Sequence, residues 1–146
     1  MTALFEHSPW VEARADAAPP SGDRHADLMA VVHAASPAER LALIRAHPEL
    51  AGKASVDGTL TEASAAEQAS AGLDRLSQAE FDRFHALNAA YVARFDFPFI
   101  ICVRLTDKAG ILAAMERRLG NERETEIATA IDEIGKIVDL RLKDMA

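Results

Sequence analysis

Apolar side chains recur at steps of three or four residues along most of the chain, the spacing of helices that bury one face. One such stripe runs through residues 81–95 and a second through residues 127–142. The sequence "SQAE" at Ser77–Glu80 is a capping box before the first stripe, and "SPAE" at Ser36–Glu39 is another box, with proline at the first helical position. Asn121 with Glu124 is expected to open the helix of the second stripe. Further helices are predicted at Pro9–Ala15, Arg24–Ala34, Thr61–Ala71 and Lys108–Leu119.

One segment departs from the helical pattern. "FDFPFIICVRL", residues 95–105, is rich in aromatic and β-branched residues and contains Pro98, which removes a backbone donor and keeps Phe97 out of a helix. The sequence therefore predicts an all-α, compact, single-domain bundle over residues 1–146. We expect about seven to eight helices, with one extended segment near residues 97–104.

The composition narrows the class of protein. Hydrophobic residues make up 49% and charged residues 27% of the 146 residues, which is ordinary for a globular domain, and the net charge of −7 argues against a nucleic-acid partner. The longest apolar run, residues 97–103, is far below the roughly 20 residues of a membrane helix. The amino terminus lacks the basic start of a secretory signal, and a single cysteine, Cys102, excludes an internal disulfide and a cysteine-based zinc site. We expect a metal-free cytoplasmic protein that binds no membrane.

His47 is the first candidate for chemistry. In "RLALIRAHPELAGK", residues 40–53, Pro48 disfavours a helical conformation of the residue before it, so the helix is expected to end at or before His47. The imidazole would then lie on a fixed corner of the chain. A histidine near a helix carboxyl end also suits the helix dipole, and the spacing alone leaves both interpretations open.

Ser64, Glu67 and Gln68 lie three or four residues apart among alanines, on one helical face. Ser64 and Glu67 also fit a further capping box, and the sequence alone slightly favours that interpretation. Arg104 follows an apolar run, which would draw it inward, where it needs an anion. Arginine binds carboxylates, histidine shuttles protons, and glutamate can orient the histidine. These residues predict a site for a small polar anionic ligand and leave the reaction open.

The motifs "HPELAGK", "S..EQ..AGL", "LN..Y...F.FPFIICVR" and "RL.N....E...A", with "FEHSPW" near the start, resemble the 2-oxo-4-hydroxy-4-carboxy-5-ureidoimidazoline (OHCU) decarboxylases in order and spacing over nearly the whole chain. The resemblance implies an all-helical, usually dimeric enzyme that forms (S)-allantoin in the last step from urate, without a cofactor or a metal. It places the catalytic histidine on His47, its acidic partner on Glu67 and the arginine for the substrate carboxylate on Arg104. It lines the substrate pocket with Pro48, Ser64, Gln68 and the backbone of Phe99, Ile100, Ile101, Cys102 and Val103.

One position departs from the family pattern. The family tends to have glycine before "FPF", where this chain has Asp96. If the backbone there needs a positive φ, aspartate is among the least costly substitutes for glycine.

Two other functions remain as alternatives. The first is a non-catalytic helical domain that binds an anionic ureido metabolite or a protein partner, with His47 and Glu67 as helix-end residues. The second is an enzyme acting on another ureido acid such as allantoate. Metal-dependent ureidohydrolases need several clustered His, Asp or Glu ligands, and none cluster in this sequence.

Overall fold

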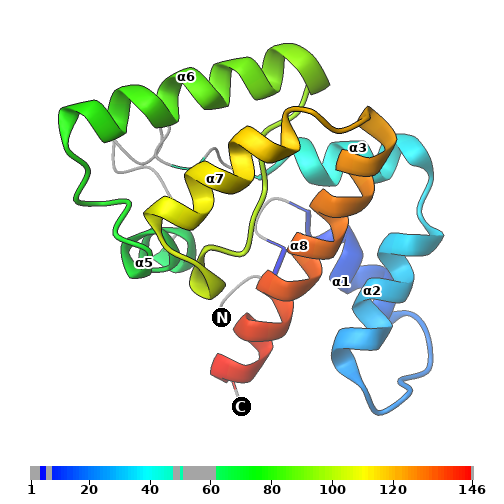
Figure 1. Ribbon diagram of the computed structural model, residues 1–146. Coiled ribbons are helices and arrows are strands. Elements are labelled where there is room, and N and C mark those ends of the chain that lie inside the picture. The colour runs from blue at the N-terminus through cyan, green and yellow to red at the C-terminus, as the bar shows by residue number, and fades with distance from the viewer. Residues whose placement is uncertain (1–3, 6–7, 48–49, 51–61, 146) are drawn as a thin grey trace.

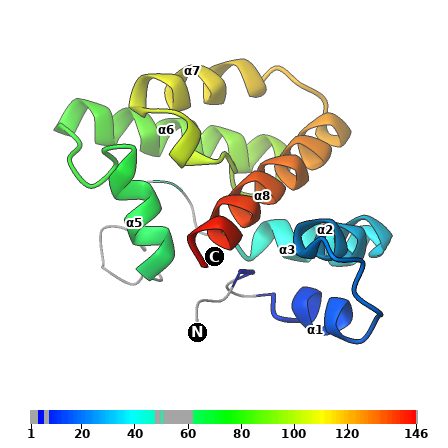
Figure 2. The ribbon, with the colours of Figure 1, turned by 90° about the horizontal axis from the view of Figure 1, so that it is seen from below.

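The computed structural model describes residues 4–5, 8–47, 50 and 62–145, and this part of the chain is all-α. Its helices are α1 (Trp10–Asp16), α2 (Arg24–Ala34), α3 (Pro37–Arg45), α5 (Glu62–Ser70), α6 (Gln78–Phe95), α7 (Lys108–Arg118) and α8 (Arg123–Met145), with a short 3-10 helix, η1 (Val103–Leu105). Helix α8 crosses the molecule, with α5, α6 and α7 to one side of it and α1, α2 and α3 to the other (Figures 1 and 2). The predicted fold class is confirmed.

Local sequence signals explain most helix ends. Ser36 and Ser77 both form complete capping boxes, in which the serine side chain accepts from the backbone of the glutamate three residues later and that glutamate accepts in return. The predicted opening of the last helix by Asn121 and Glu124 is wrong. Helix α8 begins at Arg123, and the Asn121 side chain donates instead to the Glu126 carboxylate at 2.9 Å. The acceptor is a nearby carboxylate in the first turn of α8, which is buried and therefore needs hydrogen-bond donors.

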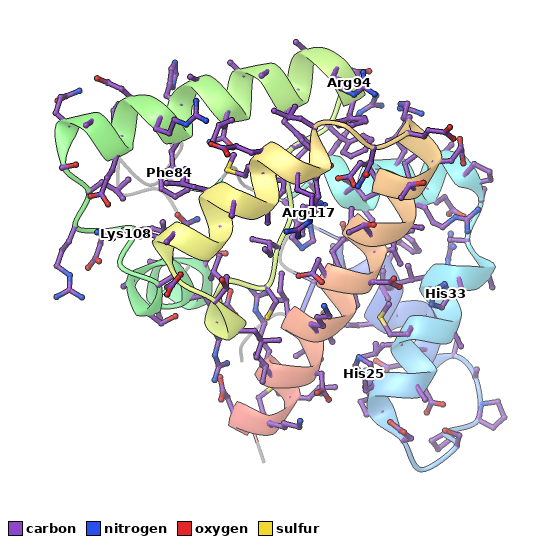
Figure 3. The ribbon with its side chains drawn as sticks, in the orientation of Figure 1. His25, His33, Phe84, Arg94, Lys108 and Arg117 are labelled. Atoms are coloured by element: carbon purple, nitrogen blue, oxygen red, sulfur yellow. The ribbon has the colours of Figure 1, made fainter. Side chains whose placement is uncertain are left out.

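The two predicted apolar stripes form the core. On α6, Phe84, Leu87, Tyr91 and Phe95 are buried, and Figure 3 shows Phe84 pointing inward from this helix. On α8 the buried apolar side chains include Ile131, Ile134 and Val138. The phenylalanines of the 97–99 segment pack edge-on against the Tyr91 ring, so the non-helical segment is part of the same core.

A buried polar cluster joins α6, α7 and α8. The Glu126 carboxylate is fully buried and accepts hydrogen bonds from the Tyr91 hydroxyl at 2.5 Å and from Arg118 Nε at 2.8 Å. Burial and the hydrogen bond to Glu126 raise the pKa of Tyr91, which therefore stays protonated and acts as a donor. The second Arg118 donor, Nη1, binds the Ile100 carbonyl at 2.8 Å. The cluster thus fixes the helices and the segment between them together.

Asp96 ends α6 in the left-handed conformation, with φ 63° and ψ 32°. It is the one non-glycine residue with positive φ in the described part of the chain, as the glycine of the resembling family led us to expect. Arg45 at the end of α3 donates to both the Asp96 carboxylate and its carbonyl, at 2.6 and 3.0 Å. The αL turn redirects the chain into the extended segment. That segment is shorter than predicted, because Arg104 lies in η1, closed by hydrogen bonds from Leu105 and Thr106 to the Cys102 and Val103 carbonyls.

Candidate active site

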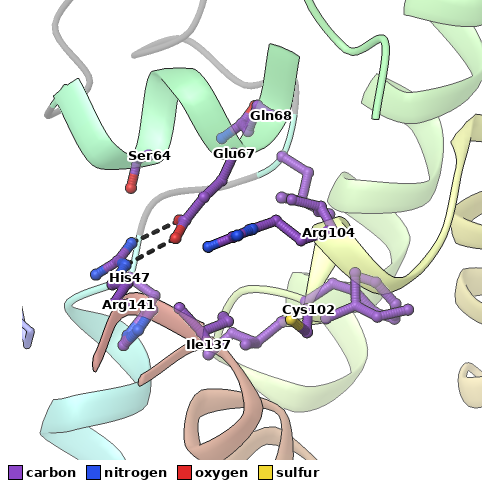
Figure 4. Close-up of a pocket in the computed structure, with 13 residues that line it drawn as sticks. His47, Ser64, Glu67, Gln68, Cys102, Arg104, Ile137 and Arg141 are labelled. Carbon is purple, nitrogen blue, oxygen red and sulfur yellow. Dashed lines mark hydrogen bonds and ion pairs between the residues drawn. The ribbon is translucent and has the colours of Figure 1, made fainter. Parts of the chain in front are cut away.

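A recess of about 470 Å³, open to solvent, lies where α5, α8, the end of α3 and the segment before α7 meet (Figure 4). His47, Glu67 and Arg104 point into it from three separate elements. The full lining is His47, Leu50, Ser64, Glu67, Gln68, Phe99, Ile100, Ile101, Cys102, Val103, Arg104, Ile137 and Arg141. Ten of the eleven predicted site residues are therefore brought together, and the eleventh, Pro48, lies outside the described residues.

His47 lies just beyond the carboxyl end of α3, which stops at Arg45 with Ala46 as its cap. The predicted helix end is confirmed. The His47 Nδ1 atom lies 3.1 Å from the Leu43 carbonyl oxygen, one turn back along the helix. A carbonyl can only accept, so this contact assigns the proton to Nδ1 and makes Nε2 the basic nitrogen of the neutral ring.

Helix α5 carries Ser64, Glu67 and Gln68 on the face that lines the recess. The alternative interpretation of Ser64 and Glu67 as a capping box is wrong, because α5 begins at Glu62 and Ser64 therefore lies inside the helix. Ser64 and Gln68 are buried. Helix α5 also packs against η1, which brings this face next to Arg104.

The Glu67 carboxylate is held by Arg141 of α8. Arg141 Nε donates to Glu67 Oε2 at 2.8 Å and Nη2 donates to Oε1 at 2.6 Å, a bidentate pair between residues 74 positions apart (Figure 4). The side chains are 5% and 13% exposed. Arg141 also donates from Nη1 to the Leu4 carbonyl at 3.1 Å. Its guanidinium thus fixes the amino-terminal segment, α5 and α8 around one carboxylate.

Arg141 is not among the site residues predicted from the sequence. Arg141 lies near the carboxyl end of a predicted helix, where a positive charge is explained by its favourable interaction with the helix dipole. A better signal was present in the pattern, because Arg141 lies three residues after Val138 and seven after Ile134, on the buried face of α8. A lone arginine on a buried stripe needs a buried anion, and Glu67 is that anion. Ile137, which also lines the recess, carried no such signal.

Arg104 has a different kind of partner. Its Nη1 and Nη2 atoms donate to the two carboxylate oxygens of Asp144 at 2.7 and 3.2 Å, and this hydrogen bonding raises the Arg104 pKa further. The Arg104 and Asp144 side chains are 30% and 59% exposed. Solvent-accessible ion pairs of this kind contribute little stability, so another carboxylate can replace Asp144 at small cost.

The wall opposite α5 is the backbone and side chains of residues 99–103. Cys102 contributes its side chain there, and burial, with the Glu133 carboxylate as the next largest cause, raises the pKa of the thiol. A thiol in that state is a poor nucleophile at neutral pH. We therefore assign Cys102 a role in shaping the wall.

The other histidines of the described residues, His25, His33 and His85, do not line the recess. His25 and His33 lie on α2 (Figure 3), where His25 Nε2 is 2.9 Å from the Gly135 carbonyl. Within the described ranges, no group of three or more His, Cys, Asp and Glu residues is placed to hold a metal ion. No helix in that part of the chain is both long and apolar enough to cross a membrane.

The arrangement defines a helical protein with a recess suited to a small anionic ligand, in which a histidine, a carboxylate and an arginine lie beside the largely non-helical residues 99–103. Comparisons with known proteins make this specific. Residues 1–143 match the OHCU decarboxylase family, and the chain belongs to it.

Two relatives and one solved structure illustrate the match. The chain is 41% identical over 144 residues to the 2-oxo-4-hydroxy-4-carboxy-5-ureidoimidazoline decarboxylase of Haloferax volcanii, covering 97% of this chain and 83% of that protein. It is 40% identical to the uric acid degradation bifunctional protein PucL of Bacillus subtilis, over 98% of this chain and 29% of PucL. It superposes on a crystal structure of (S)-allantoin synthase with a TM-score of 0.70 and 30% identity, over 97% of this chain and 46% of that one.

Proposed function

We propose that the protein decarboxylates OHCU to (S)-allantoin in urate degradation, without a cofactor. The observation that carries the proposal is the convergence of His47, Glu67 and Arg104 with the 99–103 backbone on one recess, in a chain that belongs to the OHCU decarboxylase family. The names of its relatives support the reaction, the pathway and the product.

The substrate supplies its own electron sink. Its carboxylate is attached to a carbon that bears a hydroxyl and lies next to a C=N bond. When the C–C bond breaks, CO2 leaves and the bonding electrons move toward that C=N bond, giving an enediol-like intermediate. A proton delivered to one face of the neighbouring carbon then sets the S configuration.

Each side chain has a role in this sequence. His47, with its proton on Nδ1, offers Nε2 as the base for the substrate hydroxyl, and as the acid afterwards. Arg104 exchanges the exposed Asp144 carboxylate for the substrate carboxylate. Glu67, held in place by Arg141, provides a fixed negative charge beside the imidazolium and accepts from substrate N–H groups.

The test is to generate OHCU from urate in situ and to follow allantoin chirality by circular dichroism. We expect chelator-treated protein to produce the (S) signal faster than the spontaneous, racemic background. A circular-dichroism signal no larger than that of the spontaneous reaction would refute the enzymatic function. It would favour the alternative, a non-catalytic helical domain that binds an anionic metabolite.

Conservative substitutions of His47 and Glu67 test their catalytic roles. We expect His47→Asn and Glu67→Gln to lose most of the turnover per folded molecule, because 10²–10⁴-fold is the typical contribution of a positioned acid–base group. His33→Asn on the exposed face of α2 and Glu124→Gln on the exposed start of α8 are the matched controls. Full activity in both site variants would show that His47 and Glu67 have structural roles and take no part in the reaction.

Arg104→Lys should raise KM far more than its conserved charge suggests, because a planar two-donor fork is replaced by a point charge. Arg117→Lys, at an exposed position of α7, is the control. An unchanged KM in Arg104→Lys would remove Arg104 from the substrate site.

The single-domain organisation of residues 1–146, the homodimer and the cytoplasmic location are also part of the proposal. The first two are tested by one cooperative melting transition and by sedimentation of the purified protein at twice the mass of the chain. A monomer that is fully active would refute the homodimer and leave the proposed reaction unaffected.

A further inference from the structure

The two peptide groups that flank Ile101 are anchored by buried side chains from the last two helices. Arg118 Nη1 of α7 donates to the Ile100 carbonyl at 2.8 Å. The Cys102 N–H donates to Glu133 Oε1 of α8 at 3.0 Å. Arg118 and Glu133 are 4% and 8% exposed, and neither lines the recess, whereas residues 99–104 do. The segment is therefore held from outside the recess.

This anchoring fixes the direction of the Ile101 polar groups. In a trans peptide group, the C=O and the N–H point in opposite directions, and the described part of the chain has no cis peptide bond. Because Ile100 C=O points to Arg118, the Ile101 N–H points away from Arg118. Because Cys102 N–H points to Glu133, the Ile101 C=O points away from Glu133.

Ile101 thus presents one donor turned away from Arg118 and one acceptor turned away from Glu133, on a recess-lining residue that is only half-buried. Neither group makes a hydrogen bond to another residue of the described chain. Backbone polar groups that the protein itself leaves unpaired are satisfied by water, which a complementary ligand can displace. A ureido group or a ring amide, which carries N–H next to C=O, is the complementary ligand.

We propose that Glu133 is a positioning residue for the substrate: it holds the Cys102 N–H and so directs the Ile101 N–H and C=O at an amide or ureido group in the recess. The inference rests on the proposed function for the identity of that group. Glu133 suits the role because its second oxygen, Oε2, is held at 2.5 Å by the half-exposed Lys136, one turn along α8. The carboxylate is therefore fixed at both oxygens, and its charge strengthens the bond to the Cys102 N–H.

The experiment compares Glu133→Ala with Glu133→Gln in the in-situ OHCU assay. Alanine removes the acceptor for the Cys102 N–H, whereas glutamine keeps a side-chain oxygen of the same reach. We expect Glu133→Ala to raise KM about tenfold or more, the effect of losing one to two well-placed hydrogen bonds, and to lower the enantiomeric excess of allantoin. Glu133→Gln should restore both values to within about threefold of wild type.

A further variant serves as the control. Asp132→Ala changes the exposed neighbour of Glu133 and should keep the wild-type KM. A folded Glu133→Ala protein with unchanged KM and enantiomeric excess would overturn the proposal, and so would a Glu133→Gln protein as defective as Glu133→Ala.

An NMR measurement that does not depend on turnover tests this inference separately from the proposed function. Amide hydrogen exchange by NMR should show a protected Cys102 N–H in the wild type and in Glu133→Gln, and fast exchange in Glu133→Ala. Titration with (S)-allantoin should shift the Ile101 amide resonance in the first two proteins and not in the third. An inactive wild type would refute the proposed function alone, whereas an Ile101 amide that does not respond in the wild type would overturn the role of Glu133.

Discussion

The bidentate pair of Arg141 and Glu67 gives the sharpest test of how the site is held. Arg141 is buried and Glu67 is mostly buried, with side chains 5% and 13% exposed, and both Glu67 oxygens accept from the guanidinium. Arg141→Met would leave the carboxylate without this cation and would also remove the hydrogen bond to the Leu4 carbonyl. Removing one member of a buried pair typically costs about 3–5 kcal/mol. For a chain of this size, that loss corresponds to a melting temperature lower by about 10–15 °C.

The double-mutant cycle with Glu67→Met isolates the pair. Two methionines of similar length replace both charges, so the double variant should be less destabilised than the sum of the single variants, with a coupling energy of about 2 kcal/mol. The pair Lys143–Asp139 on the same helix is the control, since its side chains are 69% and 41% exposed. Its coupling energy should be about 0.3–0.5 kcal/mol.

Urea unfolding followed by far-ultraviolet circular dichroism measures each free energy, and the in-situ OHCU assay measures turnover of the same preparations. We expect the double variant to be folded and inactive, because its stability is partly restored while the carboxylate is absent from the recess. A coupling energy for Arg141 and Glu67 no larger than that of the surface control would refute the argument that this pair ties α5 to α8.

Three other predictions concern the fold. Ile131→Asp should abolish cooperative melting, because Ile131 is 4% exposed in the core of α8 and an unpaired buried charge costs several kcal/mol; a soluble protein with a normal thermal transition would contradict this. Asp96→Ala should lower the free energy of unfolding in urea by about 1–2 kcal/mol, because alanine tolerates the positive φ at this position less well than aspartate. Asp96→Gly should change that free energy by less than about 1 kcal/mol, because the ion pair with Arg45 that it removes is exposed and contributes little. The hydrogen bond from Arg14 lowers the pKa of Glu39 from 4.5 to about 2. The stability that Glu39 contributes is therefore present above pH 4.5 and is lost as the pH falls toward 2. The melting temperature of Glu39→Gln should fall less over this pH range than that of the wild type.

The parts of the fold that follow from local sequence were predictable. Capping boxes at Ser36 and Ser77 placed two helix starts to the residue, since the bonds they make lie within four positions of the chain. The proline at position 98 predicted the interruption between α6 and α7. Asp96 was predictable for a different reason: the resemblance to a family with glycine there indicated an unusual backbone conformation, and the structure has it.

The parts that depend on which carboxylates the fold buries were not predictable in the same way. Asn121 has the spacing of a cap to Glu124, yet its side chain binds Glu126, because that carboxylate is buried and needs donors. Ser64 and Glu67 have the spacing of a capping box, yet they lie inside α5, and Glu67 binds an arginine 74 residues away. In each case a local pattern offered a modest hydrogen bond, whereas the folded structure required donors for a carboxylate that is buried or mostly buried.

Helix α8 connects the stability of this protein to the geometry of its recess. Its apolar stripe forms much of the core, and the same helix supplies Arg141 to one wall, through Glu67, and Glu133 to the other, through the Cys102 N–H. The walls themselves come from short or non-helical pieces, α5 and residues 99–103, which have little regular structure of their own to fix them. A long helix that is rigid because it is buried can hold such pieces to within the tolerance that acid–base chemistry demands. The cost is that a small rotation of α8 moves both walls at once, so substitutions in its core face should change KM and enantioselectivity before they abolish folding.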